Sequence, residues 1–124
     1  MPKVRIDRIE CQAQKDAKGE AEIWLLAQSD GGMHVRYPAG PVAAQNISEG
    51  GTWQIGDLEL EFEGCCNLAI YEQDLNVDIS LTDFQGCVSF MAGADDLVDK
   101  IATNGSDSSD SGYSKYAVGF TNLG

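Results

Sequence analysis

The sequence predicts an all-β fold, namely an antiparallel β-sandwich of about eight strands with one short helix before the last strand. Apolar and polar residues alternate over short segments, which is typical of strands with one buried face. Clusters of Gly, Pro, Ser and Asp separate these segments at short intervals, as turns do. The chain has 124 residues, the size of one domain, so we expect a single sandwich spanning residues 1–124.

The first half of the chain contains three segments with strand patterning. Residues 3–13 alternate in two phases with a slip at Asp7-Arg8, which indicates one long strand with a bulge or two short strands. Residues 21–28 (AEIWLLAQ) begin amphipathic and become fully apolar, and residues 33–37 form a short strand that ends at Pro38. Residues 43–51 show no regular pattern and are expected to be irregular.

The second half alternates more clearly. Residues 52–63 predict a strand with a turn or bulge at Gly56-Asp57, and in its second part Leu58, Leu60 and Phe62 share the inner face. After a turn at residues 64–67, strands are expected at residues 68–71, 87–91 and 113–121.

One segment has helical features. In residues 94–103 (ADDLVDKIAT), Asp95 and Asp96 suit the first turn of a helix and Asn104-Gly105 would end it. Leu97, Val98 and Ile101 would form its apolar stripe.

The charge of the chain restricts its partners. Twenty acidic residues against eight basic ones give a formal net charge of −12. Nucleic-acid binding is excluded, because phosphate contacts need clustered Lys and Arg. Divalent cations would relieve the repulsion among the acids, although the acids can also serve solubility alone.

Neither a secretory signal nor a transmembrane segment is visible. The start of the chain, MPKVRIDRIE, lacks an apolar stretch of signal-peptide type, so we expect a cytoplasmic protein, with non-classical export as the alternative. The four cysteines are expected to be reduced thiols, with a Cys11–Cys87 bridge as the other possibility. The two tryptophans, Trp24 and Trp53, are expected to anchor the core.

Acidic residues gather beside the ends of the expected strands. Asp16 and Glu22 flank the start of one strand, Glu72 and Asp74 stand at the end of another, and Asp83 precedes a third. Calcium takes six to eight oxygen ligands from flexible loops, so carboxylates that converge from separate segments are the pattern it needs. These five acids are the candidate metal ligands, and calcium is the candidate cofactor.

The order of these features resembles the C-two domain, the calcium-dependent phospholipid-binding β-sandwich found in protein kinase C and synaptotagmin. The family's first calcium loop is matched by Asp16, Gly19 and Glu22 in DAKGEAEIWL. Trp53 before LELEF, Glu72-Gln73-Asp74 at a strand end, and Asp83-Phe84-Gln85-Gly86 follow in the family's order. The resemblance implies the sandwich, a calcium site at one end, and docking to anionic lipid.

The sequence also departs from the family pattern. Glu replaces Asp at positions 22 and 72, and the segment between Asp74 and Asp83 is longer than the family's loop. Val77, Ile79 and Leu81 alternate with polar residues there, which predicts an extra short strand that would separate Asp83 from Glu72.

Three functions therefore remain to be distinguished. The leading hypothesis is a calcium-binding interaction module that docks to anionic phospholipid or to an acidic protein partner through the bound ion. The alternative is a metal-free structural or assembly protein that makes protein–protein contacts, including a homo-oligomer. The third is a small hydrolase or a secreted effector with an acid-based site. The sequence disfavours a hydrolase because His34 is the single histidine and no Gly-x-Ser-x-Gly motif occurs. We expect no enzymatic activity.

Overall fold

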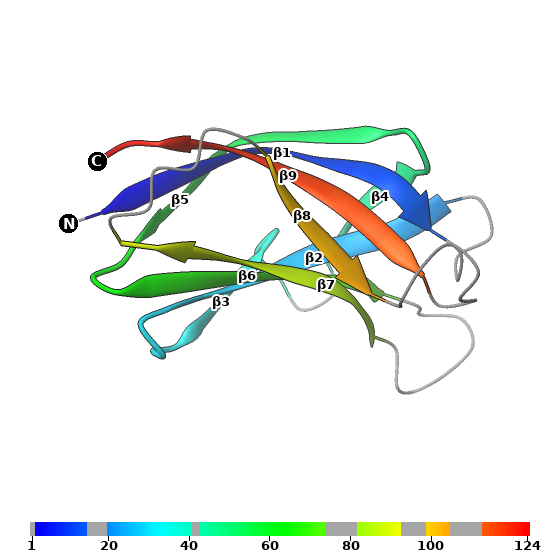
Figure 1. Ribbon diagram of the computed structural model, residues 1–124. Helices are drawn as coiled ribbons and strands as arrows, with labels where there is room; N and C mark the ends of the chain where they lie inside the picture. Colours follow the sequence, from blue (N-terminus) through cyan, green and yellow to red (C-terminus); the bar gives the residue numbers. More distant parts are fainter. Residues whose placement is uncertain (1, 15–19, 41–42, 74–81, 93–98, 105–112) are drawn as a thin grey trace.

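The chain forms two antiparallel sheets packed face to face in a computed structural model (Figure 1). The structure describes residues 2–14, 20–40, 43–73, 82–92, 99–104 and 113–124, with the backbone alone for Glu20, Thr82 and Asp83. Its strands are β1 (Lys3–Gln14), β2 (Glu20–Ser29), β3 (His34–Tyr37), β4 (Gln45–Ser48), β5 (Thr52–Glu61), β6 (Cys65–Gln73), β7 (Thr82–Met91), β8 (Lys100–Asn104) and β9 (Ser114–Asn122).

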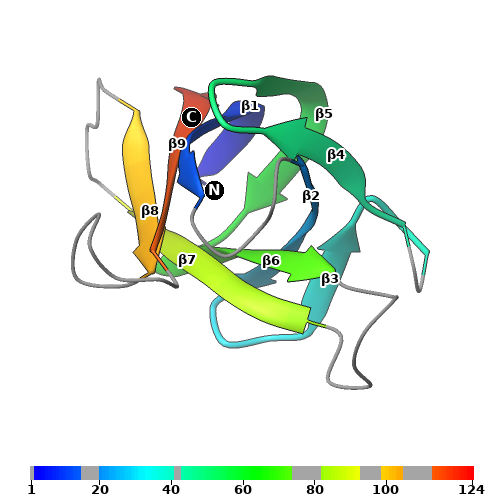
Figure 2. The ribbon, with the colours of Figure 1, turned by 90° about the vertical axis from the view of Figure 1, so that its right-hand side faces the viewer.

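The two sheets differ in strand content. The four-stranded sheet has the order β5-β1-β9-β8. The five-stranded sheet has the order β3-β2-β6-β7, and β4 pairs with the first part of β2. Figure 2 shows the two layers end-on, with the long β1 and β2 in different layers. The predicted antiparallel sandwich is therefore confirmed.

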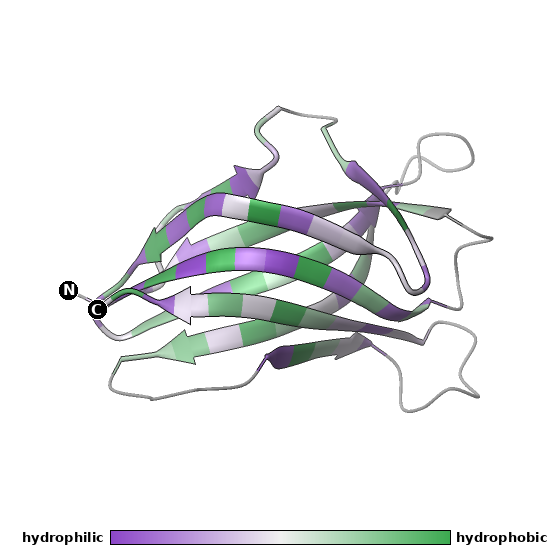
Figure 3. Ribbon diagram, turned by 90° about the horizontal axis from the view of Figure 1, so that it is seen from above, coloured by the Kyte–Doolittle hydropathy of each residue, from purple (hydrophilic) through white to green (hydrophobic). Residues whose placement is uncertain are grey.

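The alternation of the sequence sets which side chains enter the core. In β5, Leu58 and Leu60 are buried, as is Phe62 just after it, while Glu59 and Glu61 are exposed. Figure 3 shows the same alternation of hydrophilic and hydrophobic residues along the long strands. Burial of these apolar side chains is the main force that holds the two sheets together.

The slip at Asp7-Arg8 is a bulge in one long strand. The register of β1 against both β5 and β9 shifts between Ile6 and Arg8. Opposite this point, β5 continues through Gly56, which has a φ of 80°, so the expected interruption there is also a bulge. The bulge keeps Ile6 and Ile9 on the inner face, where both are fully buried.

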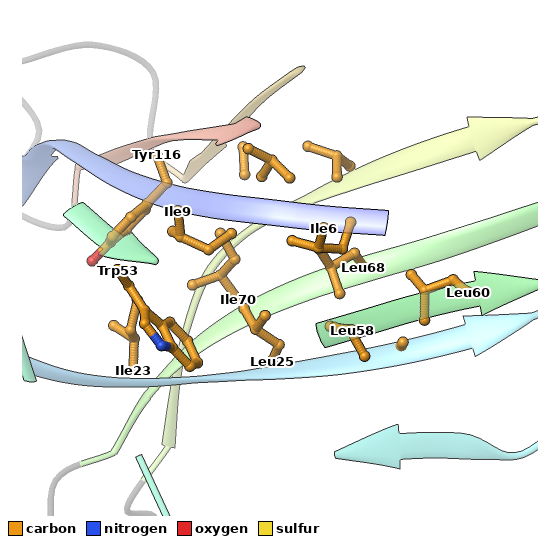
Figure 4. Packing of buried hydrophobic residues seen from close by; sticks show 14 of the residues in the cluster. Ile6, Ile9, Ile23, Leu25, Trp53, Leu58, Leu60, Leu68, Ile70 and Tyr116 are labelled. Atoms are coloured by element: carbon orange, nitrogen blue, oxygen red, sulfur yellow. The ribbon is translucent and has the colours of Figure 1, made fainter. Parts of the chain in front are cut away.

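The core lies between the two layers. Figure 4 shows Ile6 and Ile9 from β1 and Leu25, Leu68 and Ile70 from the opposite sheet pointing toward one another. Trp53 belongs to this core, as predicted.

The sheets are joined on both sides of the sandwich. On one side the chain passes from β4 in the five-stranded sheet into β5 in the other sheet. Nearby, Tyr37 stacks on Trp53 at 5.6 Å and its hydroxyl donates a hydrogen bond to Asp57. Burial and this neighbouring carboxylate raise the pKa of Tyr37 to about 12, so the phenol remains a donor at neutral pH.

On the other side, β7 lies against β8 at a second bulge. The register of β6 and β7 shifts so that Gln85 is the extra residue between Phe84 and Gly86. Asn104 Nδ2 donates to the carbonyl of Phe84 at 2.8 Å, and Ser114 Oγ donates to the carbonyl of Gln85 at 2.7 Å. These bonds fasten the five-stranded sheet to β8 and β9 of the four-stranded sheet.

Three predictions about local structure are corrected. The predicted helix is wrong over Lys100–Thr103, which belongs to β8; residues 94–98 lie outside the described part. Ala102 is fully buried and pairs with Tyr116, whereas Ile101 is 45% exposed, so pairing with β9 imposes a period of two. The described residues form nine strands rather than about eight, because β4 lies in the segment expected to be irregular, and Cys65–Asn67 belong to β6 rather than to a turn.

No helix in the described part of the chain is long and apolar enough to cross a membrane.

Gly86 is expected to be essential for the junction of β7 and β8. It has a φ of 142°, and a Cβ there would lie 2.6 Å from the amide nitrogen of Thr103. Gly86→Ala should therefore lower the free energy of unfolding by about 3 kcal/mol, from backbone strain and steric overlap together. Urea unfolding would measure this loss of free energy. Gly64→Ala, where the nearest atom is 3.4 Å away, is the matched control, and an equal loss in both variants would contradict this assignment.

Asp30 makes stability depend on pH. Its carboxylate accepts hydrogen bonds from the backbone amides of Glu63, Gly64 and Cys65, which lower its pKa. A lowered pKa in the folded state adds stability above the unfolded pKa, near 3.9, and that stability is lost as pH falls through the folded value.

Asp30→Asn should therefore unfold at a lower temperature than the wild type at pH 6. The difference should shrink toward pH 2. Asn tolerates the positive φ of 53° at this position, so backbone strain is not added. Thermal unfolding across this pH range would measure the effect. Glu63→Gln, for an exposed acid whose side chain accepts none of these bonds, is the control, and a difference independent of pH would argue against the mechanism.

Candidate functional site at one end of the sandwich

Strand ends from both sheets meet at one end of the molecule. β1 and β6 end, and β2, β7 and β9 begin, at the right-hand end in Figure 1. Hydrogen bonds and register confirm that these strand ends are close together. Gln14 of β1 pairs with Ser114 of β9, and Asn104 of β8 donates a hydrogen bond to the carbonyl of Phe84 in β7. The connections that carry residues 15–19, 74–81 and 105–112 therefore all leave from this end, which we call the loop-bearing end.

Two of the predicted metal ligands occupy facing positions there. Glu72 in β6 stands directly opposite Asp83 in β7. The side chain of Glu72 is half-buried, and its position lies opposite Ile23, which is fully buried in the core. Residues directly opposite on neighbouring strands share a face of the sheet. Glu72 therefore belongs to the inner, core-facing side of the five-stranded sheet.

Glu22 is not brought to Glu72. Ile23 and Leu25 in β2 point into the core, so Glu22, in the opposite phase, lies exposed on the outer face of the five-stranded sheet. Its partner in the register is Asn46 of β4. The two glutamates are separated by the sheet itself.

The structure does not describe two of the other predicted ligands. Asp16 and Asp74 lie outside the described residues, as does the extra strand expected around Val77, Ile79 and Leu81. Among the side chains that are described, no group of three or more His, Cys, Asp or Glu is arranged to hold a metal ion. The set of five ligands thus remains a prediction.

A further acid at this end was not predicted. Glu49 lies in the turn between β4 and β5, and its carboxylate accepts a hydrogen bond from the backbone amide of Gln14 at 3.1 Å. The same turn is held to β1 by bonds between Cys11 and the backbone of Gly50 and Gly51. An isolated Glu in a segment without strand patterning gave no sequence signal for this position.

The interior is polar toward the loop-bearing end. Gln14, Gln85 and Ser114 are buried there although the rest of the core is apolar. Tyr116 is fully buried, and its hydroxyl lies toward Trp53 in Figure 4. The hydroxyl of Ser114 donates to the carbonyl of Gln85 there, so a directional bond adds to apolar contact at this end of the core.

Next to the predicted acids, the outer face of the five-stranded sheet carries a row of stacked side chains. The guanidinium carbon of Arg36 lies 3.9 Å from the centre of the Trp24 ring, and Trp24 stacks on Tyr71 at 4.8 Å. Tyr71 meets Phe84 edge to face at 5.7 Å. These four residues, one from each of β3, β2, β6 and β7, are called the aromatic row below.

Hydrogen bonds fix the cationic end of the aromatic row. Arg36 Nη2 donates to the carbonyl of Ala43 at 2.6 Å and to Oε1 of Gln73 at 3.4 Å. Phe84, at the other end, is 42% exposed. The row adjoins the acids along the chain, because Tyr71 precedes Glu72 and Phe84 follows Asp83.

The aromatic row corrects the expectation for Trp24, which lies on the outer face rather than in the core. The signal was present in the sequence: in AEIWLLAQ the apolar residues continue into the outward phase, at Trp24 and Leu26. An outward phase that is apolar indicates a face covered by other side chains. What covers it depends on Arg36 and Tyr71, which are distant in sequence.

All four cysteines are free thiols in the structure. Cys11 is fully buried and Cys87 is exposed on the outer face, so the alternative Cys11–Cys87 bridge is not formed. Burial raises the pKa of Cys11 to about 11, which makes its thiol unreactive at neutral pH.

Comparison with known proteins yields structural similarity but no match in sequence. No model of a known protein family matches the sequence, and no curated protein matches it. Among solved structures, the chain is similar to the C-two-A domain of a plant extended synaptotagmin 1. The identity is 12% and the TM-score 0.49, over 98% of this chain and 92% of that one. The similarity is one of general strand arrangement and says nothing about what this chain binds.

The aromatic row should contribute measurably to stability. Tyr71→Leu removes both the stack on Trp24 and the edge contact with Phe84 while keeping an apolar side chain. We expect a loss of about 1–2 kcal/mol in the free energy of unfolding, the size of such ring contacts. Tyr113→Leu is the control, because Tyr113 is also half-buried and makes no ring contact with the residues described. Equal losses measured by urea unfolding would contradict a stabilising row.

Proposed function

We infer that the chain is a non-catalytic binding module that takes up calcium at the loop-bearing end. The observation that carries this inference is the register of Glu72 opposite Asp83. Acids at facing positions on neighbouring strands repel one another, and a cation between them turns that repulsion into attraction.

The sequence of the adjoining connections supplies further oxygen donors. Asp16 and Asp74 lie in the segments that join β1 to β2 and β6 to β7, both of which leave from the loop-bearing end. Calcium prefers carboxylate and carbonyl oxygens from flexible loops, so this donor chemistry suits it better than zinc. The proposed ligands are Asp16, Glu72, Asp74 and Asp83, and Glu22 is left out because it lies on the other face of the sheet.

Bound calcium would also determine which partners the chain can bind. A chain with a net charge of −12 is repelled by anionic lipid and by acidic proteins unless a cation bridges the two surfaces. We therefore propose docking to an anionic phospholipid headgroup through calcium, with an acidic protein surface as the other source of the same carboxylate or phosphate oxygens.

The proposal predicts that calcium stabilises the fold. At a free calcium concentration a hundred times the dissociation constant, binding should add about 2.7 kcal/mol to the free energy of unfolding. The midpoint temperature of unfolding should then rise by several degrees. Magnesium should have a smaller effect, because it keeps its water shell more tightly. Thermal unfolding with millimolar calcium, magnesium or chelator would measure the shift.

Three acid-to-amide variants separate the site from general charge effects. Glu72→Gln should remove most of the calcium shift. Glu63→Gln, at the opposite end of the sandwich, and Glu22→Gln, on the outer face, should keep it. A shift that is absent in the wild type, or that falls equally in all three variants, would reject the metal site.

If the shift is present, sedimentation with vesicles tests the partner. Vesicles containing phosphatidylserine should bind the protein in calcium and release it in chelator, whereas vesicles of phosphatidylcholine alone should not bind. Calcium binding without vesicle binding would favour the acidic protein partner.

A further inference from the structure

The outer face of the five-stranded sheet carries an apolar patch. Beside the aromatic row lies a second line across the sheet, in which Leu26, Ala69 and Cys87 occupy facing positions of β2, β6 and β7. Met91, 57% exposed, stands on the same side opposite Cys65. The polar line Gln28, Asn67 and Ser89 separates Met91 from the apolar patch. An exposed apolar patch rimmed by polar residues marks an interaction surface.

This face also carries few acids. Among the side chains that the structure describes on it, Glu22 is the one carboxylate, and it lies at the margin, in the stretch of β2 that pairs with β4. The four-stranded sheet, in contrast, bears Glu59 and Glu61 beside Lys3, and Asp99 beside Arg8.

The charge distribution limits which occupant can approach. Two copies of a chain with a net charge of −12 repel one another through any acid-rich surface. Among the described side chains, the outer face of the five-stranded sheet carries fewer acids than the four-stranded sheet, so two copies would repel one another less through it. A strongly basic partner would instead be drawn to the acids elsewhere on the molecule.

The aromatic row is also complementary to itself. It has a cation at one end, Arg36 on β3, and an exposed ring at the other, Phe84 on β7. A two-fold axis through the middle of the row would place Phe84 of one copy against Arg36 of the other, twice over. Such reciprocal contacts are the rule in symmetric dimers, and guanidinium groups bind ring faces.

We propose that this face docks a second copy of the chain, with the aromatic rows of the two copies crossing in opposite directions. The dimer does not depend on the calcium proposal, since its contacts lie on the outer face and Glu72 lies on the inner one. Raising the salt concentration from about 0.05 to 0.5 M should tighten the dimer, because salt screens the repulsion between the copies.

Sedimentation velocity of the reduced protein over a range of concentrations tests the proposal. The wild type should dimerise in chelator, and Phe84→Glu should weaken the dimer by about 30-fold or more, as loss of an interface hot spot does. Ile101→Glu is the matched control: Ile101 is 45% exposed against 42% for Phe84, but it lies on β8 of the other sheet. The dissociation constant of the Ile101→Glu dimer should rise no more than about threefold, as expected for a site outside the interface.

A second readout uses the exposed thiol of Cys87. Its reaction with a maleimide should be slow in the dimer and faster on dilution or in Phe84→Glu. If thermal unfolding shows that Phe84→Glu does not fold, Cys87→Glu replaces it in the sedimentation experiment. A wild type that is monomeric at high concentration and high salt would overturn the proposal, as would a dimer lost in Ile101→Glu or in chelator. A monomer that protects Cys87 by binding phosphatidylcholine vesicles would assign the face to lipid instead.

Discussion

The close approach of β7 to β8 at Gly86 is the constraint on which the rest of the sandwich depends. A residue with a side chain cannot stand there, because the amide of Thr103 and the Cβ of Ala102 occupy that space. The bulge at Gln85 brings the backbone into this position, and Asn104 and Ser114 hold its carbonyls. Without this junction one side of the two layers would be open, and the buried polar end of the core would be exposed to water.

The same junction connects the candidate site with the outer face. Phe84 lies between Asp83, which is a proposed calcium ligand, and the bulge that fastens β7 to the other sheet. Tyr71 stands in the same relation to Glu72 on β6. The inner acids and the outer rings therefore share a short stretch of two paired strands and project from its opposite faces.

Much of the fold could be predicted from the sequence, because alternation with a period of two requires no long-range knowledge. The bulge at Asp7-Arg8 and the inward phase of Leu58, Leu60 and Phe62 follow from local pattern alone. β8 could not be predicted this way: Lys100–Asn104 is a strand because Ala102 finds Tyr116 across β9, a contact that the local sequence does not encode. The likeness of ADDLVDKIAT to a helix is a local preference, and over Lys100–Thr103 pairing with β9 overrides it.

In the candidate site, too, local pattern predicts some features and long-range pairing determines the others. That acids would gather at strand ends was visible in the sequence, and the register places Glu72 opposite Asp83. That Glu22 stands on the opposite face follows from strand phase, which spacing along the chain does not show without the sheet. The aromatic row needed all four strands in order, since Arg36, Trp24, Tyr71 and Phe84 have no common spacing.

The two ends of the chain lie side by side, at the end of the sandwich away from the loops. The amide of Lys3 donates to the carbonyl of Gly124, and the amide of Leu123 donates to the carbonyl of Lys3 (Figure 1). A short linker could therefore join the termini, and the chain could be reopened elsewhere as a circular permutant with the same strand order in space. Tethered to a solid support at either terminus, the molecule would hold the paired positions of Glu72 and Asp83 at the end of the sandwich away from the support.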